Sequence, residues 1–600
     1  MSGPLTAAKM AERSFRIITA SMLAGFVAAC GDQAGPDVTA PSVPKPAGEA
    51  AVADAPPSQT AAGNSHVTTT PAGHYLAARQ ALYFNDVGQS AAFFLETLAA
   101  GSDSIPLLRQ AFLTQYYYGD IERAAALGRQ LEGLDVIVPL GGEPGTALAI
   151  RKGDWAAALV LADKIAEDGT AQVLAGIIRA WSLVATGQGD AGISTLLEAG
   201  RLTIDAEGGM PPYFRLHAAL MAEYLGLEAE AEHRASGLED RLQSAHLMLQ
   251  LAAFKARRGN WQAVDDIITG RLSTQFNQSQ VRAALEKQAD TPTDPSRMIA
   301  DAIVAMALDD RDNESGQSIS ARLRFSLFID PDNHFSRLLL AQQMADFGQA
   351  DVALANLARI SDASMYGQLA RLTESSVIED EGDIPRAIET LQRVVEMDPE
   401  NASLHQRLGD IHRRHEQFRQ SRDAYMAALA LGRDSGGLHR SLGVALERLG
   451  ETRAAETHLL RAIEIDPSDA YALNYLGYWW ADEGRNLEEA IAMIEHAVSK
   501  RPDSGFFVDS LGWVHFRLGD PETAVGYLER ATELEPSDPE ITGHLGDVYW
   551  VLGRHDEARF KWRLALSLSQ DEDEQEMLSD RLANGLPESE MPASKMPGGD

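Results

Sequence analysis

The chain has 600 residues, which is too long for one hydrophobic core, so we expect several domains or one elongated array. Its formal net charge of −35 argues against nucleic acid as a partner, because phosphates require a basic surface. The charge indicates a solvated acidic surface or, more sharply, a preference for basic protein segments. A single cysteine excludes an internal disulfide and argues against cysteine-based metal sites.

Residues 1–29 predict a signal peptide. Three basic residues precede an uncharged, mostly apolar stretch that is too short to span a bilayer as a helix. Small residues then stand directly before the only cysteine, in V-A-A-C at 27–30. This pattern resembles a bacterial lipoprotein signal peptide, and the resemblance implies cleavage before Cys30 and lipidation of that residue. The alternative is an ordinary secretory signal followed by a chance cysteine.

Two features follow from the lipoprotein resemblance and the composition after Cys30. By similarity to lipoprotein sorting in Gram-negative cells, Gly31 in place of an aspartate favours the outer membrane, facing the periplasm, over retention at the inner membrane. Residues 30–72 are rich in Ala, Pro, Thr, Gly and Ser and cannot bury enough surface to offset their ordering entropy. We therefore predict a lipidated, disordered linker that holds the folded part away from the membrane.

From about His74 onward the apolar residues follow helical spacing, and an internal period becomes visible. Leu-Gly pairs recur with their glycines 34, 34, 35 and 34 residues apart. The five pairs are Leu408-Gly409, Leu442-Gly443, Leu476-Gly477, Leu511-Gly512 and Leu545-Gly546. Small residues and a large apolar residue follow most of the pairs at shared offsets, one inserted residue shifts this set in the third unit, and a proline ends several units.

This shared pattern resembles the tetratricopeptide repeat, which implies two antiparallel helices per unit and an all-α superhelical solenoid. Small residues let the paired helices approach closely, large residues fill the seam between them, and the proline stops the second helix. Asp538 and Pro539 are typical of an N-cap and a first-turn proline that begin a unit.

Weaker repeats and boundaries extend over the rest of the chain. We predict degenerate repeats at 73–270, an irregular connection or hinge at 271–320, the solenoid proper at 321–570, and a polar capping helix with a disordered tail at 571–600. The hinge is predicted because TPTDPS and DDRDNESGQ interrupt the rhythm. Glycines predicted to mark the turns of the weak repeats are Gly88, Gly119, Gly153, Gly187, Gly226 and Gly259.

The sequence contains no catalytic pattern that we recognise, so we predict neither an enzyme nor a cofactor. G-x-G-x-x-G occurs at 187–192, but it lies between predicted helices, whereas a nucleotide site needs a preceding strand. His412 and His415 are neighbours on one helical face, yet no second ligand pair has metal spacing, so no metal site is predicted.

First helices line the concave surface of such a solenoid, and this surface is where partners usually bind. Positions six and three before each Leu-Gly glycine, and one and four after it, should face the groove. The last three units place aromatic and acidic side chains there, which suit an extended peptide or a partner helix. The predicted groove residues are Tyr471, Asn474, Tyr478, Phe506, Asp509, Trp513, Phe516, Asp547 and Trp550. The alternative is that these side chains pack against neighbouring first helices or a folded-back tail.

The combination of the V-A-A-C motif at 27–30 (a lipobox), the linker and the helical repeats resembles a group of proteobacterial repeat lipoproteins. The resemblance is closest at residues 473–520. In the resembling system, an outer-membrane repeat lipoprotein is the adaptor of a periplasmic carboxyl-terminal processing protease. The resemblance implies a scaffold that binds the protease and delivers substrates such as cell-wall hydrolases. The alternative function is an accessory lipoprotein for assembly or secretion by an envelope machine, without a protease partner.

Overall fold

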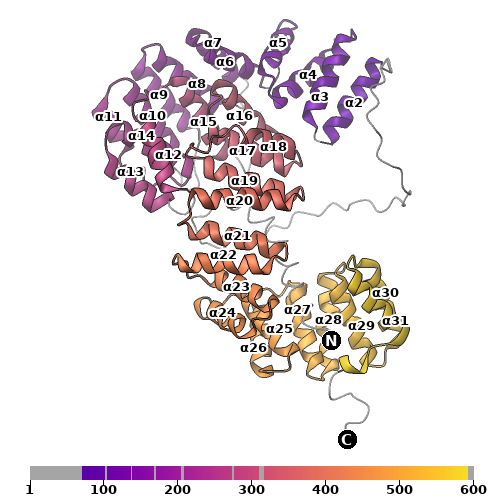
Figure 1. Ribbon diagram of the computed structural model, residues 1–600. Coiled ribbons are helices and arrows are strands. Elements are labelled where there is room, and N and C mark those ends of the chain that lie inside the picture. The colour runs from indigo at the N-terminus through magenta and orange to yellow at the C-terminus, as the bar shows by residue number, and fades with distance from the viewer. Residues whose placement is uncertain are drawn as a thin grey trace. The chain divides into compact units, whose positions relative to one another are not determined.

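The computed structural model describes residues 70–591, apart from short gaps at 85, 102–103, 137, 139, 168–170, 204–208, 273–275 and 310–315. Every regular element in these ranges is helical: thirty α-helices, one π-helical segment and one 3-10 helix (Figure 1). The all-α prediction is confirmed. The predicted signal peptide, Cys30 and most of the predicted linker lie outside the described residues.

The chain divides into two compact units, the first ending at Thr390 and the second beginning at Leu391. This boundary falls within one helix, α20 (Ile384–Met397), and not in the predicted hinge at 271–320. Each unit is described by itself below.

The first unit begins with six successive helix pairs joined by short turns. Their bounds are α2 (Pro71–Tyr83), α3 (Val87–Ala99), α4 (Ile105–Tyr118), α5 (Ile121–Glu132), α6 (Gly142–Arg151), α7 (Trp155–Glu167), α8 (Gln172–Ala185), α9 (Gly189–Gly200), α10 (Pro212–Tyr224), α11 (Glu228–Ala235), α12 (Ala245–Arg257) and α13 (Trp261–Ile267), which the π-helical η2 (Ile268–Leu272) extends. The remaining helices of this unit are α14 (Gln278–Gln288), α15 (Pro295–Asp309), α16 (Gly316–Ile329), α17 (His334–Asp346), α18 (Ala350–Leu357) and α19 (Gly367–Asp380), followed by α20.

The prediction of an irregular connection at 271–320 is wrong for most of that stretch. Residues 278–288 and 295–309 are helices, and α16 begins at Gly316. In TPTDPS, Asp294 is a helix-start signal, because its side chain accepts a hydrogen bond from the Arg297 amide at the start of α15; most of DDRDNESGQ lies outside the described residues. The Asn277 side chain likewise accepts a hydrogen bond from the Gln280 amide at the start of α14. The described part of this stretch is mostly helical, and its helices α15 and α16 pack against earlier helices of the unit.

Helices α15 and α16 pack against the first helices of the preceding pairs. Helix α15 contacts α8 and α10, and α16 contacts α4 and α6. The Arg324 guanidinium donates to the Tyr117 carbonyl over 2.9 Å, and the Arg151 guanidinium lies 4.5 Å from the centre of the Phe328 ring. Since first helices line the concave surface of a solenoid, the first unit fills this surface with its own helices.

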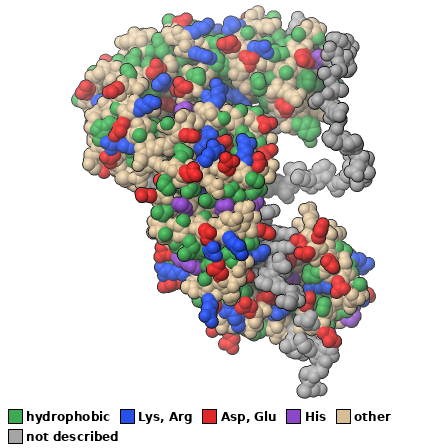
Figure 2. Space-filling view, in the orientation of Figure 1, with side chains coloured by type: hydrophobic (Ala, Val, Ile, Leu, Met, Phe, Trp, Pro, Cys, Tyr) green, Lys and Arg blue, Asp and Glu red, His purple; other side chains and the backbone are tan. Residues whose placement is uncertain are grey.

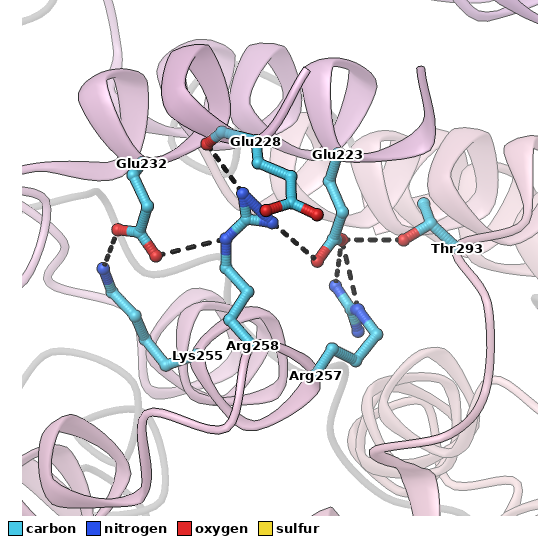
Figure 3. A network of polar contacts seen from close by, with 7 residues as sticks. All are labelled: Glu223, Glu228, Glu232, Lys255, Arg257, Arg258 and Thr293. Carbon is cyan, nitrogen blue, oxygen red and sulfur yellow. Dashed lines mark hydrogen bonds and ion pairs between the residues drawn. The ribbon is translucent and has the colours of Figure 1, made fainter. Parts of the chain in front are cut away.

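A polar network holds the chain where it enters α15 (Figure 3). The Arg257 guanidinium and the Thr293 hydroxyl both donate to the same oxygen of Glu223, over 2.7 and 2.8 Å. Beside them, Lys255 and Arg258 donate to the two oxygens of Glu232 over 2.8 and 3.1 Å. Charge-assisted bonds of this kind are stronger than neutral ones, and the shared oxygen of Glu223 joins Thr293, just before α15, to α10 and α12.

The second unit is a regular array of helix pairs with a final single helix. Its helices are α21 (Ala402–Arg414), α22 (Phe418–Ala430), α23 (Gly436–Arg448), α24 (Thr452–Ile465), α25 (Ala470–Asp482), α26 (Leu487–Lys500), α27 (Gly505–Arg517), α28 (Pro521–Leu534), α29 (Pro539–Val551), α30 (His555–Leu568) and α31 (Glu572–Asn584), with the 3-10 helix η3 (Glu588–Glu590).

The predicted seam residues form the core of each pair in the second unit. Leu459, Leu528 and Trp562 are fully buried, each opposite a Leu-Gly glycine of the paired helix. A Cβ atom built on Gly477 would lie 2.8 Å from the Ala490 carbonyl oxygen, which is closer than a side chain tolerates. Glycine is therefore required at this position for the helices to approach.

The predicted turn glycines and the predicted N-cap lie where the sequence places them, with one exception. Gly450 and Gly519 adopt left-handed φ angles of 74° and 82° between paired helices, where glycine has no steric penalty. The Asp538 side chain accepts hydrogen bonds from the Glu540 and Ile541 amides, as an N-cap should. Gly88 was predicted to mark a turn, but it lies inside α3.

Candidate protein-binding face

Three consecutive first helices of the second unit, α25, α27 and α29, pack side by side. Their shared surface carries aromatic and polar side chains that contact one another across the helices. We call this surface the α25–α29 face, and it is formed by Asn474, Tyr478, Asp509, Ser510, Trp513, Glu540 and His544. Among the described helices, none from outside the consecutive array makes an extensive contact with it, in contrast to the filled concave surface of the first unit.

The nine predicted groove residues divide into two groups in the structure. Tyr471, Asn474, Trp513 and Trp550 are partly exposed. The other five are 8% exposed or less: Tyr478, Phe506, Asp509, Phe516 and Asp547. The prediction that all nine line an open groove is therefore wrong for these five. They pack between neighbouring helices, which is the alternative stated in the sequence analysis. Binding through the remaining four stays a prediction.

Asp509 and His544 form a buried ion pair between α27 and α29. The Nδ1 atom of His544 lies 3.1 Å from both carboxylate oxygens of Asp509, and the imidazole stacks on Trp513 with ring centres 4.0 Å apart. Burial opposes the charged imidazolium, but the negative charges of Asp509 and Glu540 raise the pKa of His544 to about 9. His544 is therefore a cation at neutral pH, and its charge balances that of Asp509.

Glu540 has no comparable partner. Its Oε1 atom is inaccessible to solvent and makes no hydrogen bond within the described residues. Burial, and next the charges of Asp509 and Asp538, raise its pKa to about 8 despite the opposing effect of His544. The Oδ1 atom of Asn474 and the Nε1 atom of Trp513 are also buried there without a hydrogen-bond partner.

The Asn474 amide also joins α25 to α27. Its Nδ2 atom donates to the Ser510 hydroxyl over 3.1 Å, which orients the amide and leaves Oδ1 as the unused acceptor. Tyr478, four residues later, is buried beside Glu540, Asp482 and Asp509, and burial raises its pKa well above the ordinary value. The face thus combines an aromatic floor with two unused acceptors and one unused donor.

Asp547 and Trp550 belong to a structural cluster at the end of the array. The Trp562 indole donates to Asp547 over 2.8 Å, and the Arg581 guanidinium of α31 lies 3.1 Å from the other Asp547 oxygen. Trp550 stacks on His555 with ring centres 4.2 Å apart. The ion pair with Arg581 ties the capping helix to Asp547, and Trp550 packs on α30, so both side chains already have partners within the chain.

Sequence reasoning left Glu540 and His544 out of the predicted site, although the predicted offsets include position 540. His544 lies two residues before its glycine, an offset that the groove rule did not count. The sequence feature that could have identified His544 is its spacing of four residues from Glu540, which places an acid and a base on one helical face.

Other predicted features of the chain concern metals and membranes. The Nδ1 atom of His412 pairs with the Gln417 side chain over 2.7 Å. Within the described ranges, no group of three or more His, Cys, Asp or Glu side chains is arranged to hold a metal ion. The same part of the chain contains no helix with the length and hydropathy of a membrane span.

Comparisons with known proteins agree with the repeat architecture. The family described as Tetratricopeptide repeat matches residues 440–505 and 510–569, and a Tetratricopeptide repeat-like domain matches residues 300–451. The matched segments therefore contain tetratricopeptide repeats, in agreement with the array of paired helices that the structure shows there.

Two relatives in sequence share only a small part of their length with this chain. A TPR repeat-containing protein of Pseudomonas aeruginosa is 36% identical over 101 residues, which are 17% of each chain. A tetratricopeptide repeat-containing protein of Caenorhabditis elegans is 26% identical over 211 residues, 34% of this chain and 26% of the relative. The solved structure of the APC/C hetero-tetramer Cut9-Hcn1 aligns with 87% of this chain and 99% of its own at 15% identity, with a TM-score of 0.36.

Proposed function

We propose that the protein is a lipid-anchored scaffold in the periplasm that binds a protein partner through the α25–α29 face. In this role it recruits an envelope protease, of the carboxyl-terminal processing class, together with its cell-wall hydrolase substrates. The observation that carries the proposal is the difference between the two units. The first unit fills its concave surface with α15 and α16, whereas the α25–α29 face keeps polar atoms without partners.

The chemistry of this face supports a protein ligand. Aromatic side chains with a few fixed polar groups are typical of the central part of protein interfaces. Trp513 and Asn474 are partly exposed, although the one polar atom of each that lacks a partner is buried.

The proposed anchor rests on the sequence alone. The lipobox ends at Cys30 and the first described helix begins at Pro71, so about 40 residues of Ala/Pro/Thr-rich composition would separate the lipid from the array. Such a tether lets the binding face reach a partner that is not itself fixed to the same patch of membrane.

An affinity purification from envelope extracts, analysed by mass spectrometry, tests the proposal with the full, tagged chain. Glu540→Lys places a like-sized cation on the face, and Glu533→Lys makes the same charge change on the exposed surface of α28. We expect wild type and Glu533→Lys to retain a protease or cell-wall enzyme and Glu540→Lys to lose it. Equal recovery with all three forms would refute the binding face, and recovery of secretion-machine components alone would refute the protease partnership.

Anchoring is tested separately on the same chain. Cys30→Ser should abolish incorporation of labelled fatty acid and release the protein from the membrane fraction. Continued lipid labelling of the Cys30→Ser form would refute the anchor.

A further inference from the structure

A small cavity lies in the first unit where α16 packs against α4, beside the start of α3 and the turn between α17 and α18. Its volume is about 120 Å³, which is room for about four water molecules. Tyr118 and Val352 line the cavity and are 52% and 41% exposed, so it opens to the surface. Met344 and the ring of Phe347 form part of its mostly apolar wall. The cavity can therefore hold only a small ligand.

Arg324 of α16 reaches this cavity without a counter-ion. Its guanidinium donates to the Tyr117 carbonyl over 2.9 Å and to the Met344 sulfur over 3.3 Å. A thioether is a weak acceptor, and the carboxyl end of α4, to which Tyr117 belongs, supplies only about half a negative charge. No carboxylate of the described residues forms an ion pair with Arg324, and burial lowers the pKa of its guanidinium to about 10. Arg324 is therefore a cation whose charge the chain does not balance.

The glycine that ends α4 holds Arg324 in this position. Gly119 adopts a left-handed φ of 97°, and a Cβ atom built on it would lie 2.7 Å from Arg324 Cδ. A larger residue at this position would therefore displace the stem of Arg324. Arg324 is also partly exposed and lines the cavity, so a ligand inside the cavity can reach it. The arrangement is a positioned cation beside a small, open and mostly apolar space.

We propose that this cavity binds a small monocarboxylate, with Arg324 as the donor to the carboxylate and Met344 and Phe347 against the carbon chain. The planar guanidinium matches a carboxylate in shape, and it keeps N–H groups that neither Tyr117 nor Met344 uses. The volume limits the ligand to a carboxylate with about two or three carbons. This site belongs to the first unit and does not depend on the α25–α29 face.

The neighbouring charges favour an anion with a single charge. Asp86 lines the same cavity, and its Oδ1 atom accepts from the Gln89 amide at the start of α3. Because Coulomb repulsion grows with charge, Asp86 disfavours the dianion of phosphate more than a monocarboxylate. On the face of the first unit visible in Figure 2, Lys and Arg side chains are interspersed with Asp and Glu, so this face has no broad basic surface. Anion binding should therefore depend on the single guanidinium of Arg324.

Propionate and propionamide have nearly the same shape and differ in charge, so they test the inference with the full chain. In ligand-observed NMR titrations we expect saturable binding of propionate at concentrations up to about 10 mM, at least about tenfold tighter than that of propionamide, since a charge-assisted bond is lost. Arg324→Gln should abolish this preference. Val352→Asp leaves Arg324 in place but adds an anion at the mouth of the cavity, and it should weaken propionate binding at least about threefold. Val160→Asp makes the same change on the surface of α7, where Val160 is 62% exposed, and should leave binding unchanged.

Equal affinity for propionate and propionamide, or no saturable binding of propionate, would overturn the inference. Equal weakening by Val352→Asp and Val160→Asp would overturn the location of the site. Inorganic phosphate and the dipeptide acetyl-Ala-Ala, which ends in a free carboxylate, complete the series. Tighter binding of phosphate than of propionate would overturn the choice of a monocarboxylate, and tighter binding of the dipeptide would overturn the small size of the ligand.

Discussion

Replacing Gly477 with alanine should destabilise the second unit, although alanine is the better helix former. The new Cβ would lie 2.8 Å from the Ala490 carbonyl oxygen and 2.8 Å from Ile494 Cγ1, so α25 and α26 would have to separate. Overpacking of this kind costs about 1–3 kcal/mol, against a gain of about 1 kcal/mol in helix propensity. We therefore expect a net loss of up to about 2 kcal/mol.

Gly526 provides a matched control of opposite sign. It lies in α28, and a Cβ built on it meets nothing within 4 Å, so Gly526→Ala should stabilise by about 0.5–1 kcal/mol. Urea unfolding followed by tryptophan fluorescence measures both, because Trp479 and Trp480 adjoin Gly477. A Gly477→Ala midpoint equal to or above that of wild type would refute the close packing on which the repeat geometry rests.

Three further predictions concern buried polar groups. Trp562→Phe removes the donor to Asp547, which is 0% exposed, and should lower the free energy of unfolding of the second unit by roughly 1–3 kcal/mol in urea titrations. Because the pKa of His544 is raised from 6.5 to about 9, its stabilising charge is fully present below pH about 6.5 and is lost as the pH rises through 9. Thermal scans should therefore show a falling midpoint between pH 7 and 10, and His544→Asn should flatten this slope. Burial lowers the pKa of His217 to about 4, so its contribution is present above pH 6.5 and lost as the pH falls through 4, and His217→Phe should reduce the loss of first-unit helicity that circular dichroism detects over that range.

The sequence predicts the second unit well because its signals are local. The five Leu-Gly pairs, the seam residues and the cap at Asp538 each depend on neighbours within one repeat, and each lies where the period places it. Close helix approach leaves the same residue choice in every unit, so a fixed spacing is enough to find it.

The first unit was harder to predict because its packing depends on contacts far apart in sequence. Nothing near Arg324 indicates that its guanidinium meets the Tyr117 carbonyl, 207 residues earlier. The break in period at 271–320 was visible, but the docking of α15 and α16 onto earlier first helices was not.

At the candidate site, too, the sequence predicts positions but not the contacts that neighbouring helices make with each side chain. A rule of offsets finds which positions of a first helix face inward, but it does not distinguish a side chain that packs from one that stays accessible. Asp509 and Trp513 satisfy the rule equally, yet Asp509 is 0% exposed and paired with His544, whereas Trp513 keeps an unused donor. That distinction depends on the neighbouring helix, α29.

Site-specific photo-crosslinking in cells tests the central claim most directly, that partners bind the α25–α29 face. A photoreactive phenylalanine analogue at Trp513 places the probe on the face, and the same analogue at Phe560, which is 59% exposed on α30, places it on a second helix. We predict crosslinks to a protein partner from position 513 and none from position 560. Crosslinks from position 560 alone, in cells where the tagged chain still recovers its partner, would contradict the account.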